Sequence, residues 1–332
     1  MSVSGLKRST YGEAILEGFT YLLENHEEVF VIGQGLWSPW YVGSSMTDLD
    51  KKFGIERVMD SPVSELACTG AAVGASLFGY RPIVVHPRMD FMLYAMDPIV
   101  NQAAKWSHML GGQAHPAVTI RGIINRGGEQ GAQHSQALHS WFAHIPGLRV
   151  VMPATVEDAR DLLIAGTLCD DPVIYIDDRW LYHIEEDLSP PRIHDLASLG
   201  NIVRREGKDI TLAASSYSFH QCQQAADELA KEGIDCELVD LRILNPLDID
   251  PVIESVQKTG NLIVVDGGWQ TCGLASEVVA GTCVAVDPSI WSNPPVRINL
   301  PATPAPTSKP LEELYYINTE EIITAVRTML EK

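Results

Sequence analysis

The chain has 332 residues, of which 45% are hydrophobic and 20% charged, a composition that predicts a globular protein of about two domains. Its formal net charge of −19 argues against nucleic acid or an anionic membrane surface as a partner, because both require clustered Lys and Arg. No apolar run reaches the roughly 20 residues that cross a bilayer, and the first residues lack the apolar core of a secretory signal, so we expect a cytoplasmic protein.

The first half of the chain alternates short β-branched runs with stretches of helical periodicity. The expected strands cover residues 29–32, 57–60, 82–85, 117–120, 148–152 and 173–176. The expected helices cover residues 11–23, 65–79, 92–106 and 156–168. This alternation predicts a parallel sheet with helices on both faces.

The alternation is interrupted over residues 177–209, where Ser-Pro-Pro-Arg and a charged segment occur. It then resumes, with expected strands at 210–213, 236–240 and 261–265 and expected helices at 221–231 and 275–284. We therefore expect a first α/β domain over residues 1–185, a linker over 186–207 and a second, smaller α/β domain over 208–332.

One carboxylate stands where the strand at 57–60 passes into a helix of small, apolar residues. This residue is Glu65, and the carboxyl ends of strands are where open α/β sheets bind their ligands. Local context leaves two interpretations open, a catalytic carboxylate and a helix cap or dipole partner.

Two longer segments are more distinctive. One runs from Arg81 to Lys105 and contains His-Pro-Arg-Met-Asp-Phe at 86–91, and the other contains Gly-Ala-Gln-His-Ser-Gln at 131–136 followed by Trp-Phe-Ala-His-Ile-Pro-Gly. With Glu65, these segments resemble the beta subunit of the thiamine-diphosphate-dependent 2-oxo acid dehydrogenases of the pyruvate, branched-chain and acetoin type, which are relatives of transketolase. The resemblance continues through Val-Val-Asp-Gly-Gly-Trp at 264–269 and Thr-Pro-Ala-Pro-Thr-Ser-Lys-Pro at 303–310. It implies two three-layer α/β domains, a transketolase-like pyrimidine-binding domain followed by a transketolase C-terminal-like domain.

The resemblance also implies roles for individual residues. Glu65 matches the carboxylate that shares a proton with the aminopyrimidine ring of thiamine diphosphate, and Phe91 matches an aromatic side chain that packs on this ring. His134 matches a histidine at the entrance of the active site, where an imidazole can exchange protons. A core Phe and a solvated loop His are the alternative interpretations.

Family members also bind a monovalent cation, largely through main-chain oxygens. The matching positions here are Val118, Gly166, Cys169 and Asp171. Cys169 replaces an acidic residue of the family, so this site departs from the family's pattern.

A further expectation concerns a motif that the sequence lacks. In the family, Gly-Asp-Gly followed further along by Asn-Asn holds magnesium and the diphosphate, and this chain has no such motif. The resemblance therefore implies a cofactor shared with an alpha subunit in an α2β2 heterotetramer, with Mg²⁺ held by the partner chain. A lipoyl acyltransferase would be a further partner of a dehydrogenase.

The chain departs from its relatives just before Phe91. Many relatives carry Glu-Phe or Tyr-Ala-Asp where this sequence has His86 and Arg88, which could recognise an unusual substrate or be ordinary surface or salt-bridged side chains. The leading hypothesis is decarboxylation of a 2-oxo acid with acyl transfer to a lipoyl carrier. The alternatives are a split transketolase-like or acyloin-forming ligase that transfers a two-carbon unit to an aldehyde or sugar, and a binding subunit that has lost activity.

Overall fold

The computed structural model describes residues 6–331, which divide into two units. Unit 1 contains the described part of Met1–Arg126 together with Trp141–Leu199. Unit 2 contains Gly127–Ser140 and the described part of Gly200–Lys332. Among the helices of residues 6–331, none has the length and apolar character that a membrane span requires.

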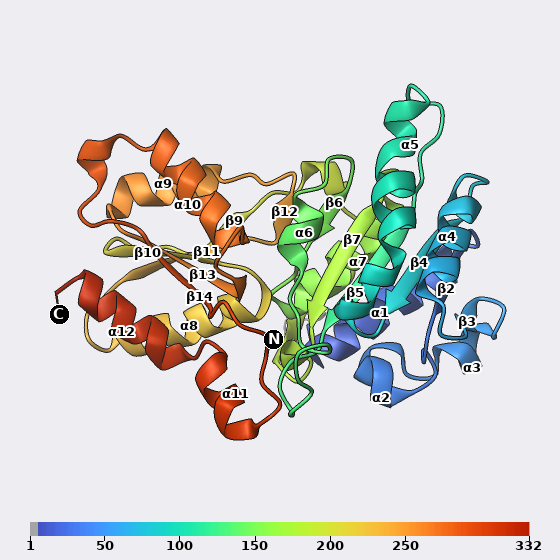
Figure 1. Ribbon diagram of the computed structural model, residues 1–332, viewed down its shortest axis with the longest axis horizontal. Coiled ribbons are helices and arrows are strands. Elements are labelled where there is room, and N and C mark those ends of the chain that lie inside the picture. Colours follow the sequence, from blue (N-terminus) through green and yellow to red (C-terminus); the bar gives the residue numbers. More distant parts are fainter. Residues whose placement is uncertain (1–5, 332) are drawn as a thin grey trace. The chain divides into compact units, whose positions relative to one another are not determined.

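The sheet of unit 1 is parallel and has the strand order β6-β7-β5-β4-β2-β3 (Figure 1). Every residue of β5 and β7 is buried, as expected for central strands with helices on both faces. A separate antiparallel pair joins β1 (Lys7–Thr10) to β8 (Glu185–Leu188). The strands of the sheet are β2 (Val29–Gly33), β3 (Val58–Asp60), β4 (Arg81–His86), β5 (Thr119–Ile124), β6 (Arg149–Val151) and β7 (Val173–Asp178).

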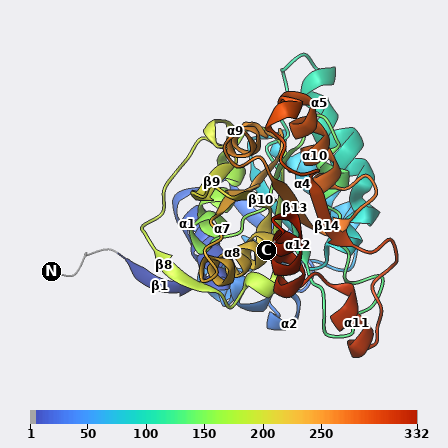
Figure 2. The ribbon, with the colours of Figure 1, turned by 90° about the vertical axis from the view of Figure 1, so that its left-hand side faces the viewer.

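Helices cover both faces of this sheet. Figures 1 and 2 show α1 (Tyr11–Asn25) and α7 (Val156–Leu168) on one face and α4 (Glu65–Ser76) and α5 (Ala104–Met109) on the other. A capping box begins α1, because Thr10 accepts from the Glu13 N–H while the Glu13 carboxylate accepts from the Thr10 N–H. The shorter helices are α2 (Pro39–Val42), α3 (Leu49–Phe53) and α6 (His139–Ala143), the last containing the boundary between the units.

The single helix predicted over residues 92–106 is wrong. The segment consists of a 3₁₀ helix at Met89–Ala95, a π-helix at Asp97–Ala103 and then α5. Pro98 lies in the first turn of the π-helix, and a proline there has no N–H to continue an α-helical ladder. The 3₁₀ helix contains Phe91, five residues after the end of β4.

The sheet of unit 2 has the order β14-β13-β10-β11-β9, parallel except for the edge strand β9, which is antiparallel to β11. Figure 1 shows α8 and α12 on one face and α9 and α10 on the other. Both units are therefore three-layer α/β structures, and the predicted fold class is confirmed. The elements are β9 (Ile202–Arg205), β10 (Ile210–Ala214), α8 (Ser216–Ala230), β11 (Cys236–Asp240), β12 (Ile243–Asn245), α9 (Asp250–Thr259), β13 (Leu262–Trp269), α10 (Leu274–Ala285), β14 (Val296–Leu300), α11 (Lys309–Tyr315) and α12 (Thr319–Met329).

Candidate active site

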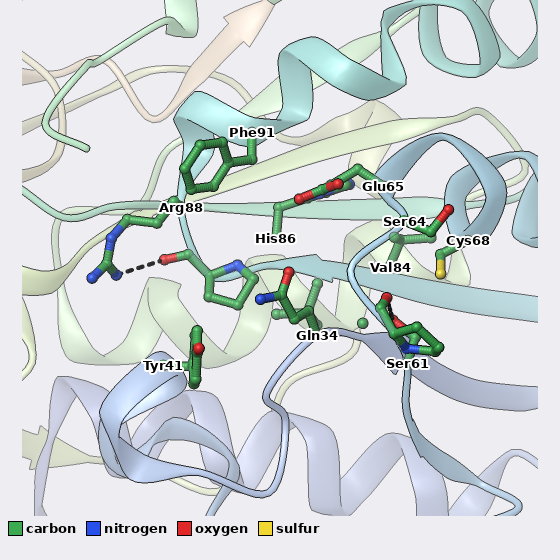
Figure 3. A pocket seen from close by; sticks show the side chains of 14 residues that line it. Gln34, Tyr41, Ser61, Ser64, Glu65, Cys68, Val84, His86, Arg88 and Phe91 are labelled. Carbon is green, nitrogen blue, oxygen red and sulfur yellow. Dashed lines mark hydrogen bonds between the residues drawn. The ribbon is translucent and has the colours of Figure 1, made fainter. Parts of the chain in front are cut away.

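A pocket in unit 1 lies where β2, β3 and β4 end and α4 begins. Open α/β sheets bind ligands at this edge because the ends of parallel strands bring loops and helix N-termini together. Figure 3 shows Phe91, Arg88 and Tyr41 along one side of the pocket and Ser61, Ser64 and Cys68 along the other. The lining residues are Gly33, Gln34, Tyr41, Ser61, Pro62, Ser64, Glu65, Cys68, Val84, Val85, His86, Pro87, Arg88 and Phe91.

Glu65 is the first residue of α4 and is half-buried in the pocket lining. Among the residues that the structure describes, none donates a hydrogen bond to its carboxylate, and Ser64 at the N-cap position makes no side-chain cap. Glu13, by contrast, does close a capping box in α1. This geometry does not support the helix-cap interpretation, and it leaves the Glu65 carboxylate available to a ligand in the pocket.

Phe91 lies in the same pocket, half-buried, at the start of the segment that follows β4. Its ring stacks on Tyr94 with the centroids 6.4 Å apart and the planes at 28°. The Phe91 N–H donates to the carbonyl oxygen of Arg88 at 3.1 Å, so a main-chain turn connects the two side chains. One aromatic ring and one carboxylate thus border a common cavity, with Val84 and Val85 as apolar wall.

His86 ends β4 and is 3% exposed. Its Nε2 lies 3.3 Å from the hydroxyl oxygen of the buried Thr69 on α4. Burial lowers the pKa of His86 to about 4, because the charged imidazolium is disfavoured away from water. His86 is therefore neutral near pH 7 and contributes no charge to the pocket.

Arg88 is half-buried and, with His86 neutral, is the only cationic side chain among the described residues that line this pocket. Its Nη1 donates to the Pro87 carbonyl at 3.3 Å, a contact drawn in Figure 3. With its amide oxygen turned toward the guanidinium, the buried Asn125 accepts from Nη1 and from Nη2, the latter at 3.1 Å. Burial lowers the pKa of Arg88, and the nearby charge of Arg179 lowers it further.

The turn after β2 closes the pocket from below. The Asp60 carboxylate accepts from the N–H groups of Gly35 at 2.5 Å and Leu36 at 3.3 Å, which fixes the loop that carries Gln34. Gly33 has no room for a side chain, because a Cβ there would lie 2.3 Å from the Val85 carbonyl oxygen. These constraints position the loop beside Glu65.

Sequence reasoning missed several lining residues. Cys68 could have been found from its position one helical turn after Glu65, since residues three apart lie on one helix face. Tyr41 could not, because it comes from the separate short helix α2 and has no motif around it.

His134 belongs to unit 2, on the loop within Gly127–Ser140, and is half-buried. This loop is held by groups of its own unit: the Glu129 N–H donates to both carboxylate oxygens of Glu312, at 2.9 and 3.0 Å, and the Leu274 N–H donates to the Ser140 hydroxyl. The structure thus collects Glu65, Phe91, His86 and Arg88 in the unit 1 pocket. The role of His134 at that pocket stays a prediction.

A buried pair that sequence reasoning also missed fixes the end of this loop. His139 Nε2 lies 2.8 Å from the Asp266 carboxylate, and both side chains are 1% exposed. Burial raises the pKa of Asp266, but the charge and hydrogen bond of His139 outweigh it, so the pKa is lowered. The two residues are 127 positions apart, and no local pattern connects them.

The main-chain oxygens at the predicted cation site already accept hydrogen bonds. Val118 accepts from the Val173 N–H at 2.9 Å, Gly166 from the Cys169 N–H at 3.4 Å, and Cys169 from the Arg81 guanidinium at 2.8 Å. The Asp171 carboxylate pairs with Arg149 at 2.7 Å. Over residues 6–331, no group of three His, Cys, Asp or Glu side chains is arranged to hold a metal ion. The monovalent cation stays a prediction.

Comparison with known proteins agrees with this architecture. Residues 7–183 match the family "Transketolase, pyrimidine binding domain" and residues 200–322 match "Transketolase, C-terminal domain". A solved structure titled "Split gene transketolase, inactive beta4 tetramer" has a TM-score of 0.76 at 22% identity, covering 97% of this chain and 98% of that one. The fold is thus that of a transketolase-type protein.

Curated relatives narrow the family. The beta subunit of acetoin:2,6-dichlorophenolindophenol oxidoreductase from Cupriavidus necator is 40% identical over 276 residues, 83% of this chain and 81% of the relative. The mitochondrial pyruvate dehydrogenase E1 component subunit beta of Bos taurus is 34% identical over 326 residues, 97% of this chain and 90% of the relative. The chain therefore belongs to the family of E1 beta subunits of the pyruvate and acetoin dehydrogenases, and it is a component of an enzyme. The resemblance inferred from sequence is confirmed.

Proposed function

We propose that this chain is the beta subunit of a thiamine-diphosphate enzyme that decarboxylates a 2-oxo acid and passes the acyl unit to a lipoyl carrier. The observation that carries the proposal is the pocket that combines the Glu65 carboxylate with the Phe91 ring. An aminopyrimidine has one ring nitrogen to meet a carboxylate and one flat face to meet an aromatic side chain. The pocket offers both groups.

The pocket residues fit the pyrimidine half of the cofactor. Glu65 is unengaged by other described residues, and Phe91 is half-buried with its ring in the lining. When bound, thiamine diphosphate supplies the nucleophilic carbon and the electron sink that decarboxylation requires. Glu65 would hold the proton shared with the ring nitrogen, Phe91 would orient the ring, and His134 would exchange a proton at the entrance.

The other half of the cofactor site is assigned to a partner. The sequence lacks the Gly-Asp-Gly and Asn-Asn residues that hold magnesium and diphosphate in the family. We assign these ligands and the Mg²⁺ ion to an alpha subunit in an α2β2 heterotetramer. Calorimetric titration of the isolated chain with cofactor and magnesium should therefore give weak binding or none, and submicromolar affinity would contradict a shared site.

Co-expression with the alpha subunit tests the reaction. The purified complex is supplied with a series of 2-oxo acids, with and without a lipoyl domain, and carbon dioxide release is measured. Turnover that needs the lipoyl domain supports acyl transfer. Turnover that instead needs an aldehyde or sugar acceptor would replace this proposal with the carbon–carbon ligase.

Substitution of Glu65 tests the observation that carries the proposal. Glu65→Gln keeps the size of the side chain but removes the carboxylate that shares a proton with the cofactor ring. Turnover of the complex should therefore fall at least about 10²-fold with assembly intact. Glu56→Gln, at an exposed position, is the matched control. Retention of more than about a tenth of the rate, under roughly 1.4 kcal/mol of barrier, would mean that Glu65 serves only the helix end.

Substitution of His134 separates proton exchange from cofactor activation. His134→Ala should lower turnover by about 10²–10⁴-fold, the range for positioned acid–base groups. Hydrogen–deuterium exchange at the reactive thiazolium carbon should stay near normal, because we expect this exchange to depend on the proton that Glu65 shares with the aminopyrimidine ring and not on His134. Equal loss of both would show that His134 organises the site, and unchanged turnover would remove it from the chemistry.

A further inference from the structure

The fully buried arginines of unit 1 have carboxylate partners of their own, whereas the half-buried Arg57 and Arg179 donate to main-chain carbonyls. Arg121 pairs with Asp177 at 2.8 Å, Arg126 pairs with Asp178, and Arg160 pairs with Asp161 at 2.7 Å and Glu17 at 2.9 Å. These pairs neutralise charges that burial would otherwise make costly. Arg88, in the pocket lining, makes no ion pair within the described part of the chain.

The contacts of Arg88 are all with neutral groups. The Pro87 carbonyl and the Asn125 amide accept from its terminal nitrogens. Its Nε is buried and has no hydrogen-bond partner within residues 6–331. These contacts hold the guanidinium in place. Its charge has no carboxylate partner and its Nε–H has no acceptor among the described residues.

The charged groups near Arg88 do not replace the missing carboxylate partner. Burial and the Arg179 charge both lower its pKa, and the opposing effects of Asp90 and Tyr41 are smaller. Arg179 is occupied elsewhere, donating to the carbonyls of Pro39, Trp40 and Tyr41. His86, the other basic residue of this segment, is neutral and faces Thr69.

We propose that Arg88 binds an anionic group of the substrate, a carboxylate or a phosphate, that lies apart from the reacting atoms. Guanidinium binds both anions through two parallel N–H donors, and apart from the Glu65 carboxylate the other side chains that line the pocket are neutral near pH 7. This inference rests on the proposed function and deepens it. The substrate that Arg88 binds is then a 2-oxo acid with a second acidic group. In the alternative carbon–carbon ligase, it is a phosphorylated acceptor.

A matched substrate pair tests the proposal on the complex with the alpha subunit. 2-Oxoglutarate and 2-oxopentanoate have the same carbon chain and differ in the distal carboxylate; glyceraldehyde 3-phosphate and glyceraldehyde form the corresponding acceptor pair. Arg88→Gln should lower the ratio of kcat/KM for the anionic over the neutral member of one pair by about 10–100-fold. Arg88→Lys should restore part of the ratio, and Arg8→Gln, at an exposed surface pair, is the control.

The pocket thiol supplies a readout that needs no turnover. Cys68 lines the pocket and is a free cysteine, whereas Cys272 and Cys283 are free and exposed in unit 2. Millimolar 2-oxoglutarate or glyceraldehyde 3-phosphate should slow alkylation of Cys68, measured by peptide mass spectrometry, and leave Cys272 and Cys283 unchanged. Arg88→Gln should abolish this protection.

The outcomes separate the two proposals. A complex without activity on any 2-oxo acid contradicts the proposed function, and the alkylation experiment then still decides the role of Arg88. Equal loss for both members of each pair, with unchanged protection of Cys68, overturns the assignment of Arg88 and makes it a group that the alpha subunit neutralises. Loss of the ratio in only one pair supports the proposal and identifies the anion as carboxylate or phosphate.

Discussion

Arg121 lies in a central strand of the unit 1 sheet and Arg88 lies just after the neighbouring strand, yet the two arginines have opposite kinds of partner. Arg121 lies within β5, fully buried, and its charge is matched by Asp177 through bonds of 2.8 and 2.9 Å. Arg88 follows β4, half-buried, and contacts only a carbonyl and an amide. A cation that the fold encloses is neutralised by the same chain, and a cation at the edge of the pocket is not.

Tyr182 and Ser45 complete the enclosed cluster around Arg121. The Tyr182 hydroxyl donates to Asp177 at 2.6 Å, and the Arg121 Nη2 donates to the oxygens of Tyr182 and Ser45. The aromatic ring of Phe19 lies 5.5 Å from the guanidinium carbon. Such a cluster tolerates the loss of one member poorly, because the remaining charge stays buried.

Asp177→Asn should therefore produce the largest stability effect. The substitution leaves Arg121 as an uncompensated buried cation, so the free energy of unfolding should fall by about 3–5 kcal/mol. Urea denaturation measures it, with Asp187→Asn, in an exposed pair with Arg8, as a control that should change stability by less than about 1 kcal/mol. A loss of about 1 kcal/mol for Asp177→Asn as well would remove the distinction between enclosed and exposed charges.

His86 allows the comparison to be sharpened by pH. Its pKa is about 4 in the folded chain and about 6.5 in an unfolded chain, so the unfolded state binds more protons between these values. The contribution of neutral His86 to the free energy of unfolding is complete above pH 6.5 and is lost as the pH falls toward 4. The loss is about 2 kcal/mol at pH 5.

The measurement is the difference between the wild type and His86→Gln in urea unfolding at pH 7 and pH 5. The wild type should lose about 2 kcal/mol more than the variant. His144→Gln, at an exposed position, should follow the wild type. Parallel pH profiles for the wild type and His86→Gln would mean that His86 is hydrated or charged in the folded protein.

The same charged residues explain where sequence reasoning succeeded and failed. The strands predicted at 117–120 and 173–176 follow short β-branched runs, and these runs end just before Arg121 and Asp177. In the structure β5 runs to Ile124 and β7 to Asp178, since the two charges meet across adjacent strands. A one-dimensional pattern cannot show that two costly residues neutralise each other.

The pocket was predictable in part because two of its residues are placed by local order along the chain. Glu65 and Phe91 each come five residues after the end of a strand, so their positions depend on local order and on the parallel sheet, both of which the sequence patterns indicate. Tyr41 and Asn125 reach the pocket or its arginine through tertiary packing of other segments. The neutrality of His86 likewise depends on burial, which its own sequence neighbours do not reveal.

Arg88→Met should have the smallest effect on stability and completes the comparison. Methionine keeps the length of the apolar stem and removes a charge that burial and Arg179 disfavour, at the cost of the contacts with Pro87 and Asn125. Since the side chain is only half-buried and solvent screens its charge, we expect the free energy of unfolding to stay within about 1 kcal/mol of the wild type.

Arg121→Met should instead destabilise by about 3 kcal/mol or more, because it leaves Asp177 buried without a cation. Urea denaturation of both variants under one set of conditions gives the two numbers. Equal destabilisation would assign Arg88 to the fold, whereas a stable Arg88→Met that no longer distinguishes 2-oxoglutarate from 2-oxopentanoate would assign its charge to the substrate.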